Sequence, residues 1–340
     1  MPGNDPPAGG INFLDRKAIY MAKNQKSCGF RTTIGGQALI EGILMRGPEK
    51  QAVVVRGPEG LVVQEEELRL VKDKYPILGL PLVRGGVTFL DSMVRGVKAL
   101  MFSADYFPEE TGAEEPSKLE RWLDEKLGNE KMEKLVIGFS VVLAVCFSIG
   151  LFMLLPTFLA SLVELVTDSV LVRNLVDAAL RIAIFMTYMI AVSRMKDIRR
   201  VFSYHGAEHK TIFCYEKRLE LTVDNVRQQP KHHPRCGTSF MLVVIIVAIL
   251  VNTAVFALFP VDNVFLRMLV QLLLLPLVVG ITYEFNRYVG GHDNPVTNLL
   301  AKPGLWMQNS TTFEPDDSMM EVAIEALKRV IPEEEGKDKW

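Results

Sequence analysis

The sequence has few cysteines and almost no net charge. These two features argue against a disulfide-stabilised protein and against a nucleic-acid-binding protein. Its 340 residues include four cysteines, at positions 28, 146, 214 and 236, and no two of them form a CxxC pair. This spacing argues against a disulfide framework and favours a reducing, cytoplasm-facing compartment. The formal net charge is −2, so there is no overall basic field, and we expect no nucleic-acid partner.

Long apolar runs are abundant instead. Residues Leu135 to Leu155 and Ser239 to Phe259 are 21 residues each without a formal charge, enough to cross a hydrocarbon core about 30 Å thick. Two further runs, Ala178 to Ser193 and Val264 to Thr282, carry one arginine each. We expect Arg181 to lie near one end of its span and to snorkel to the interface. The sequence therefore predicts a mainly α-helical, polytopic membrane protein with four transmembrane helices.

The distribution of basic residues predicts the orientation of these spans. Ten Lys or Arg residues fall between Arg194 and Arg235, whereas residues 160–174 and 260–267 contain one each. By the positive-inside rule, the large loop and both termini are cytoplasmic, as in a multi-pass protein of an inner or plasma membrane. The first ten residues lack a basic region joined to an apolar one, so we expect no cleavable signal peptide.

The polar segments divide the chain into four parts. We expect a disordered tail over 1–32, a cytoplasmic α+β region over 33–134, the four-span region over 135–283 with a His/Cys-rich loop at 194–238, and a cytoplasmic C-terminal region over 284–340. Within the second part, β-rich runs at 51–56 and 61–66 flank Gly-Pro-Glu-Gly and predict a hairpin with a loop of about four residues. Residues 83–102 predict an amphipathic helix that lies along the membrane, packs on the spans or covers a protein core.

The histidines are concentrated in the large loop. Four of the five, His205, His209, His232 and His233, fall within 29 residues. Residues 198–216 have helical periodicity, which places His205 and His209 on one face, one turn apart. With Glu208 they form H-x-x-E-H, the inverted zincin pattern, in which two histidines ligate zinc and the glutamate activates water.

A second group of ligand types stands just before the third span. His233 and Cys236 offer the imidazole and thiolate that a four-coordinate Zn²⁺ prefers. The alternative is that these histidines only cap or hydrogen-bond helix ends near lipid headgroups. Gly206 lies between the first two ligands and costs about 1 kcal/mol in a helix interior, so a turn or a broken helix is also compatible with this segment.

Four separated blocks carry a resemblance to a known family. They are Gly35–Pro48, Tyr204–Thr211, His233–Phe240 and Tyr283–Phe285. Together they resemble the YqhQ-like family of bacterial multi-pass membrane proteins, a domain of unknown function, from about residue 33 to residue 332. The family is usually described as predicted metal-dependent enzymes. The resemblance therefore implies a divalent metal, a bacterial cell membrane and an enzymatic role, and it names no substrate.

The resemblance assigns roles to particular residues. It implies His205 and His209 as metal ligands, Cys236 or His233 as the third, Glu284 as a competing carboxylate ligand, and Glu208 as the catalytic general base. Substrate binding would fall to Glu41, Arg46 and Arg235, because an arginine can hold an anionic group bidentately. The alternative for the block at 35–48 is a packed connector whose glycines only meet backbone requirements.

Two functions from different classes follow. One is a membrane-embedded metal-dependent hydrolase with a zinc site at the cytoplasmic membrane face, acting on a lipid, a peptide or another amphiphile. The other is a non-enzymatic scaffold, or an assembly or quality-control factor, in which the cluster is structural. A catalytic zinc site keeps one position open, whereas a structural site closes it with a fourth protein ligand. The expected partners are the lipid bilayer and either membrane proteins or an amphiphilic substrate.

Transport is a third class, and the sequence favours it least. Ion-coupled transport generally needs ionisable residues near mid-membrane, and the clearest spans carry none.

Overall fold

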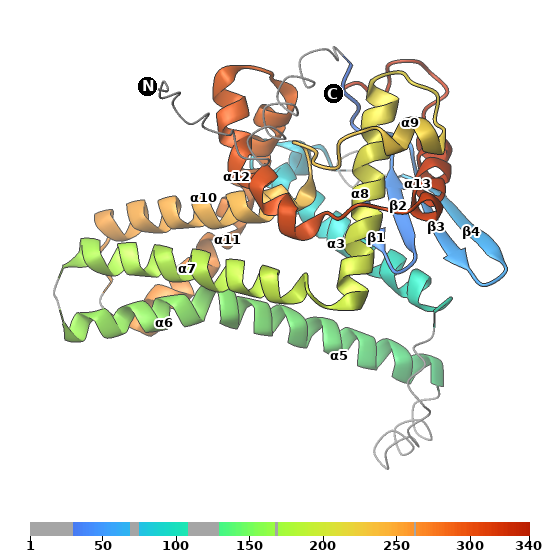
Figure 1. Cartoon of the computed structure of the whole chain (residues 1–340). Coiled ribbons are helices and arrows are strands. Elements are labelled where there is room, and N and C mark those ends of the chain that lie inside the picture. The colour runs from blue at the N-terminus through green and yellow to red at the C-terminus, as the bar shows by residue number, and fades with distance from the viewer. Residues whose placement is uncertain (1–29, 69–74, 108–128, 167–168, 262) are drawn as a thin grey trace, which may run out of the picture.

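A computed structural model describes residues 30–68, 75–107, 129–166, 169–261 and 263–340. The chain is mainly helical, with four candidate membrane spans and one small antiparallel sheet, so the predicted fold class is confirmed. The spans lie side by side, and the sheet with its covering helices lies beyond one end of them (Figure 1). The predicted disordered tail falls almost entirely outside the described residues.

Five helical segments and a π turn build the four spans. The spans cover Gly138–Ser161, Val172–Val192, Gly237–Leu258 and Val264–Gly291. The first combines α5 (Asn129–Ile149), a π turn at Gly150–Leu154 and α6 (Leu155–Ser161). Since Pro156 has no N–H to donate to the preceding turn, the π turn before it lets the span continue. The other three are α7 (Val170–Val192), α10 (Gly237–Leu258) and α11 (Val264–Gly291), and α11 contains Pro276 without ending there.

The prediction that Arg181 snorkels to the interface is wrong. Helix α7 begins eight residues before the expected start of the span, so Arg181 lies well inside it and is only 5% exposed. Its Nε donates to Asp177 Oδ2 at 2.9 Å, and its Nη2 donates to Thr157 Oγ1 at 2.7 Å and Gln271 Oε1 at 3.1 Å. An arginine whose donors are satisfied by its own helix and by two neighbouring helices does not need the interface.

The sheet has four strands in sequential antiparallel order. They are β1 (Gly35–Leu39), β2 (Gly42–Arg46), β3 (Lys50–Gly57) and β4 (Gly60–Glu67). The predicted hairpin is confirmed as β3 and β4, but its loop is shorter than expected because Gly57 pairs with Gly60, leaving only residues 58 and 59 between the strands. Strands β1 and β2 come from the glycine-rich block at 35–48.

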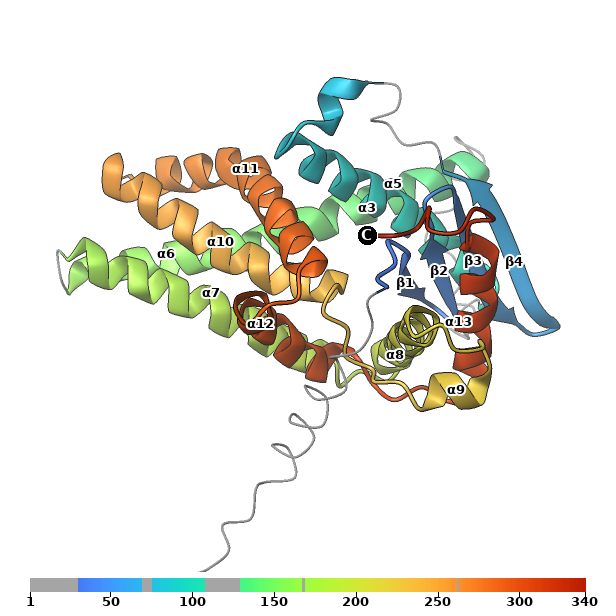
Figure 2. The same ribbon diagram turned by 90° about the horizontal axis from the view of Figure 1, so that it is seen from above.

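Helices cover both faces of this sheet. On one face, α8 (Lys196–Glu216) and α13 (Asp317–Val330) bury Ile43, Val54 and Leu327 among other apolar side chains (Figure 2). On the other face, Leu44 and Val55 pack against the end of α3 (Val83–Ala104). Alternate residues of β2 and β3 therefore point into two different cores. Four helices remain in the described part of the chain. They are α9 (Val223–Arg227), α12 (Pro295–Thr311) and two short 3₁₀ helices at Pro76–Gly79 and Leu162–Leu165.

Helix α3 is the predicted amphipathic helix, and it packs against α11 and the sheet. Its Gly85 allows a close approach to α11, since a Cβ there would lie 2.7 Å from Tyr283 Cβ. Its apolar face is turned away from the protein, with Leu90 62% and Val94 56% exposed. The alternative in which this apolar face covers a protein core is therefore wrong.

Candidate metal centre

Helix α8 carries His205, Glu208 and His209 on one buried face. The helix stands across the direction of the spans (Figure 1) and is continuous from Lys196 to Glu216, so the alternative of a turn or broken helix at Gly206 is wrong. A Cβ at position 206 would lie 2.0 Å from the backbone oxygen of Phe313. The glycine is needed because the chain after α12 passes directly against the helix here.

Cys236 comes to the same place from the start of α10. It is the N-cap residue of that helix, and its Sγ accepts a hydrogen bond from the Thr238 N–H at 3.3 Å. One ligand atom each from His205, His209 and Cys236 lies within 4.8 Å of the others. The structure thus brings together two predicted ligands from α8 and one of the two candidates for the third.

Backbone carbonyls orient both imidazoles. His205 Nδ1 lies 2.8 Å from the Thr311 oxygen, and His209 Nδ1 lies 2.6 Å from the Lys231 oxygen. Since a carbonyl oxygen only accepts, Nδ1 carries the proton in both rings and Nε2 is directed into the group. Metal-ligating histidines are held in this way in most proteins, with the second ring nitrogen bound to a carbonyl or a carboxylate.

The Nε2 atoms of the two histidines differ in their surroundings. His205 Nε2 lies 3.0 Å from Cys236 Sγ. His209 is 1% exposed, and its Nε2 has no hydrogen-bond partner among the described residues. A buried nitrogen without a hydrogen bond destabilises the fold, so such an atom is expected to bind a further group such as a water molecule or a metal ion.

Cys236 and His205 shift each other's protonation. Burial alone would raise the pKa of the thiol and lower the pKa of the imidazole. At 3.0 Å, however, the attraction between thiolate and imidazolium outweighs burial, so the pKa of Cys236 falls well below its usual value and the pKa of His205 rises to about 9. The downward shift favours the thiolate, the form that binds metals.

Glu208 is positioned by the first strand of the sheet. Its Oε1 accepts from the Gly36 N–H at 2.8 Å, while its Oε2 is buried without a hydrogen-bond partner in the described part of the chain. A Cβ at Gly36 would lie 3.1 Å from the Glu208 Cδ atom, so glycine permits this approach. Burial raises the pKa of Glu208 although both histidines oppose the shift, and a carboxyl tuned upward in this way suits a general base.

His233 lies beside the group but faces another partner. Its ring centre is 5.6 Å from that of His209, yet its Nε2 lies 3.6 Å from Glu216 Oε2. Burial lowers the pKa of His233 to about 4, and the neighbouring Arg235 charge adds to this although Glu216 opposes it. Arg235, a predicted substrate-binding residue, pairs with Glu216 and lies over the Trp340 ring at 5.6 Å.

The structure does not bring Glu284 to the metal group. Its carboxylate accepts from the Arg84 guanidinium of α3, with Arg84 Nε 2.7 Å from Oε1, and from the Leu82 N–H at 3.3 Å. In the structure this residue joins α3 to α11.

The remaining predicted substrate-binding residues also form ion pairs away from the group. Glu41, at the turn between β1 and β2, accepts from Arg200 Nη2 at 2.6 Å and from the Tyr204 hydroxyl at 3.1 Å. Arg46 pairs with Asp91 of α3. These contacts tie the β1–β2 hairpin to α8 and α3, and a role for either residue in substrate binding stays a prediction.

Some contributions to the site have no side-chain signal in the sequence. The carbonyls of Thr311 and Lys231 and the N–H of Gly36 are backbone groups, available at nearly every residue. Among these three backbone positions, only Gly36 is a glycine that permits a close approach, to Glu208. Which carbonyls face the histidines depends on tertiary structure alone.

The model of a family described as "Protein of unknown function (DUF1385)" matches residues 80–333. A relative, "Uncharacterized protein YqhQ" of Bacillus subtilis (strain 168), is 33% identical over 302 residues, covering 87% of this chain and 92% of the relative. No solved structure matches.

Proposed function

The chain belongs to the DUF1385 family, and because that family has no known function, we propose one from the site itself. The protein is a membrane-embedded, metal-dependent hydrolase that holds Zn²⁺ between His205, His209 and Cys236. The site lies at the end of the span bundle that carries the sheet. The ten basic residues between positions 194 and 235 support a cytoplasmic location for this end.

One observation carries the proposal: two oriented Nε2 atoms and a thiolate converge on one buried point. The largest separation within the group is 4.8 Å. In a tetrahedral zinc site, bond lengths of 2.0–2.3 Å place ligand atoms roughly 3.3–3.8 Å apart. Small side-chain rotations close this difference, and they also satisfy the unpartnered His209 Nε2.

The number of ligands favours a catalytic site over a structural one. His205, His209 and Cys236 supply three protein ligands, and His233, the obvious fourth, faces Glu216 instead. Three ligands leave one position open, which is typical of catalytic zinc. When bound there, zinc would lower the pKa of water to about 7 and polarise a scissile carbonyl or phosphoryl group.

Glu208 then has the general-base role. The Gly36 N–H holds Oε1, which leaves Oε2 free to accept a proton. The two candidate ligands His205 and His209 flank Glu208 on the same helix, so its carboxylate lies within the group's surroundings. The arrangement matches the division of labour in inverted zincins.

The position of Cys236 at the start of a span favours an amphiphilic substrate. A scissile bond of a substrate bound next to Cys236, at the start of α10, would lie close to the level of the lipid headgroups. His205, Glu208, His209 and Cys236 are all buried, so a substrate group can enter only if a covering segment moves. This condition predicts slow alkylation of the Cys236 thiol by a bulky reagent.

The first test loads the purified protein with Co²⁺ and records its absorption spectrum. A thiolate-to-cobalt charge-transfer band in wild type, lost in Cys236→Ser and retained in Cys146→Ser, would support the predicted ligand set. Glu208→Gln should keep the band and abolish hydrolysis of a panel of amphiphilic esters, amides and phosphodiesters. Failure of wild type to bind Co²⁺ would contradict the proposal and favour the scaffold alternative.

The 3.0 Å contact between Cys236 and His205 favours a second candidate. A thiolate beside an imidazole that a third group orients is the arrangement of a cysteine nucleophile. In that case hydrolysis would persist after metal chelation and would stop on Cys236 alkylation. Loss of activity on chelation and its return with Zn²⁺ would exclude this candidate.

A further inference from the structure

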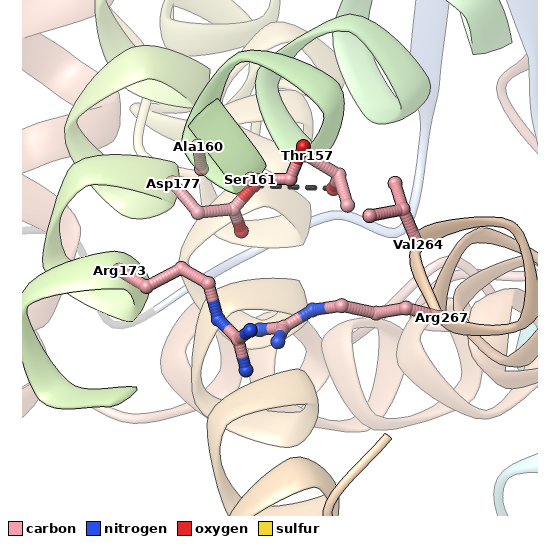
Figure 3. Close-up of a pocket in the computed structure, with 7 residues that line it drawn as sticks. All are labelled: Thr157, Ala160, Ser161, Arg173, Asp177, Val264 and Arg267. Atoms are coloured by element: carbon pink, nitrogen blue, oxygen red, sulfur yellow. Dashed lines mark hydrogen bonds between the residues drawn. The ribbon is translucent and has the colours of Figure 1, made fainter. Parts of the chain in front are cut away.

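The end of the span bundle that is far from the metal group gives a reference level in the bilayer. Arg173 of α7 and Arg267 of α11 lie near the ends of their spans, and both line a small pocket together with Ser161 and Val264 (Figure 3). Charged side chains near the ends of spans lie where the hydrocarbon core meets the headgroups. The far boundary of the hydrocarbon core therefore lies close to Val264.

Helix α3 contacts α11 near the opposite boundary. Gly280 lies sixteen residues beyond Val264, which is roughly 24 Å along the helix axis at 1.5 Å per residue. A Cβ at Gly280 would lie 2.5 Å from the Leu82 oxygen, at the start of α3. For a hydrocarbon core about 30 Å thick, this contact lies just inside the near boundary.

Helix α12 contacts α10 at a similar depth. Ser239 lies nineteen residues before the far end of α10 at Leu258, which is roughly 28 Å along the helix axis. A Cβ at Gly304 of α12 would lie 2.6 Å from the Ser239 Cβ. The next residue of α10, Phe240, stacks on Phe89 of α3 with ring centres 6.1 Å apart. Both helices therefore meet the first turn of α10 at one level, close to the near boundary.

From this contact α12 extends along the plane of the membrane. It runs across the direction of the spans and projects to one side of them (Figure 1). Because the spans cross the bilayer, a helix that lies across them at this depth runs parallel to the bilayer surface. The side chains of α12 are therefore held near the level of the headgroups.

The side chains of α12 form three faces. The first is buried against the protein and consists of Thr297, Gly304, Met307, Gln308 and Thr311. The second is exposed and apolar, has the spacing of one helical stripe, and consists of Val296, Leu299, Leu300, Pro303 and Trp306. The third is exposed and polar and consists of Asn298, Lys302 and Asn309. We call the second face the α12 stripe.

The α12 stripe is as exposed as the outer surface of the spans. Leu299 and Trp306 are each 60% exposed, against 64% for Leu250 of α10. A contiguous exposed apolar surface marks an interaction site. Beside the spans and at the level of the headgroups, the apolar surface within reach is the bilayer. Tryptophan is also enriched at this level in membrane proteins.

We propose that α12 binds the surface of the phospholipid bilayer through the α12 stripe. The stripe enters the boundary between headgroups and acyl chains, while the polar face with Lys302 meets the phosphates and water. The exposed apolar face of α3, which reaches α10 at the same level, lies on the bilayer in the same way. Two surface helices thus flank the start of α10.

The opposite face of α12 supports the candidate metal group. The Thr311 carbonyl orients His205, while Gln308 accepts from the His233 N–H at 2.8 Å and donates to the His233 oxygen at 2.7 Å. A metal group supported by α12 would lie beside the headgroups of the lipids that α12 binds. This last consequence rests on the proposed function, whereas the contact with the bilayer does not.

Quenching of tryptophan fluorescence by brominated lipid tests the proposal on the full chain in nanodiscs that hold one copy each. Bromine atoms on the acyl chains, close to the headgroups, quench a tryptophan that contacts lipid. We expect wild-type fluorescence to fall when brominated phosphatidylcholine replaces ordinary phosphatidylcholine, and Trp306→Phe to reduce this fall. Trp340→Phe, which removes the tryptophan beside Arg235, should retain it.

A tryptophan moved around α12 provides a matched pair. In the Trp306→Phe protein, Val296→Trp should restore quenching by brominated lipid. Asn298→Trp, about 200° further around the helix, should instead be quenched by iodide from the water. Both positions are exposed, so neither new side chain has to enter a packed core.

Three results would overturn the proposal. Quenching of Trp306 by iodide and not by brominated lipid would show that the α12 stripe faces water. Protection from both quenchers would show that another part of the chain covers it. Lipid quenching that disappears when each nanodisc holds two copies would assign the stripe to a dimer interface. Because neither quencher depends on zinc or on hydrolysis, failure of this experiment is distinct from failure of the proposed function.

Discussion

Replacing Gly206 with alanine tests whether the chain after α12 really presses against α8 at the metal group. The new Cβ would lie 2.0 Å from the Phe313 oxygen, where ordinary contacts begin near 3.4 Å. The two segments must therefore separate by more than 1 Å. That separation strains the hydrogen bond from Phe313 N–H to the Phe202 oxygen (3.0 Å) and the one that orients His205 on Thr311 (2.8 Å).

The size of the effect follows from three contributions. Overpacking a tight site costs about 1–3 kcal/mol. Each weakened hydrogen bond costs about 1 kcal/mol. Alanine recovers about 1 kcal/mol of helix propensity. We expect a net loss of about 2–4 kcal/mol, which for a chain of 340 residues lowers the unfolding midpoint by roughly 3–6 °C. Metal affinity should fall about tenfold or more because His205 loses its orienting carbonyl.

The assay is thermal unfolding in detergent, with and without added Zn²⁺. Gly86→Ala is the matched control, because it also lies inside a helix but a Cβ there meets nothing within 4 Å. It should be neutral or stabilising by up to about 1 kcal/mol. A Gly206→Ala protein as stable as wild type, with unchanged metal affinity, would refute this account of the site.

Three further predictions concern titratable side chains. Burial holds the pKa of His233 at about 4 against 6.5 for the free side chain. Its contribution to stability is therefore complete above pH 6.5 and is lost as the pH falls towards 4, so His233→Asn should flatten that part of a midpoint-against-pH curve. Asp177→Asn should destabilise the protein by about 3 kcal/mol in a denaturation assay, because Arg181 loses its counter-charge and keeps only neutral partners. Glu284→Gln breaks a partly exposed pair with Arg84, so it should cost at most about 1 kcal/mol and leave the bound metal, measured by mass spectrometry, unchanged.

The membrane architecture was predictable from hydropathy. The prediction was wrong where charged side chains within a span are paired. Uncharged runs located the third span to within two residues, and the first to within three residues at its start and six at its end, beyond Pro156. The start of α7 was placed too late because Arg173, Asp177 and Arg181 resemble a loop when they are considered alone. The ion pair between Asp177 and Arg181 is a local i,i+4 contact within α7, but the contacts of Arg181 with Thr157 of α6 and Gln271 of α11 are tertiary features that no local pattern contains.

Half of the sheet was also missed. Strands β3 and β4 have the alternation of β-branched residues that predicts a hairpin. Strands β1 and β2 contain several glycines, which weaken that pattern. Their glycines serve close packing instead, since a Cβ on Gly36 or Gly42 would lie 2.6 or 2.7 Å from the oxygen of Leu44 or Val54.

The candidate site was predictable in its ligand types but not in the choice among them. The spacing of His205 and His209 places both on one helical face, as the structure has them. His233 and Cys236 are three residues apart in the sequence, so spacing alone does not decide between them. Cys236 is the N-cap residue of α10, and this position directs its sulfur towards His205 and His209. Glu284 was a plausible ligand by position along the chain, and its partner Arg84 lies 200 residues away.

The most direct test of the central claim is the zinc content of the purified protein, measured by mass spectrometry. We expect close to one equivalent in wild type after exposure to Zn²⁺, less than a tenth of that in His209→Ala, and an unchanged value in His292→Ala. His292 is a suitable control because it is an exposed histidine whose ring contacts Tyr288 on α11. A folded wild-type protein that takes up no zinc, or a His209→Ala protein that keeps its full equivalent, would contradict the metal centre.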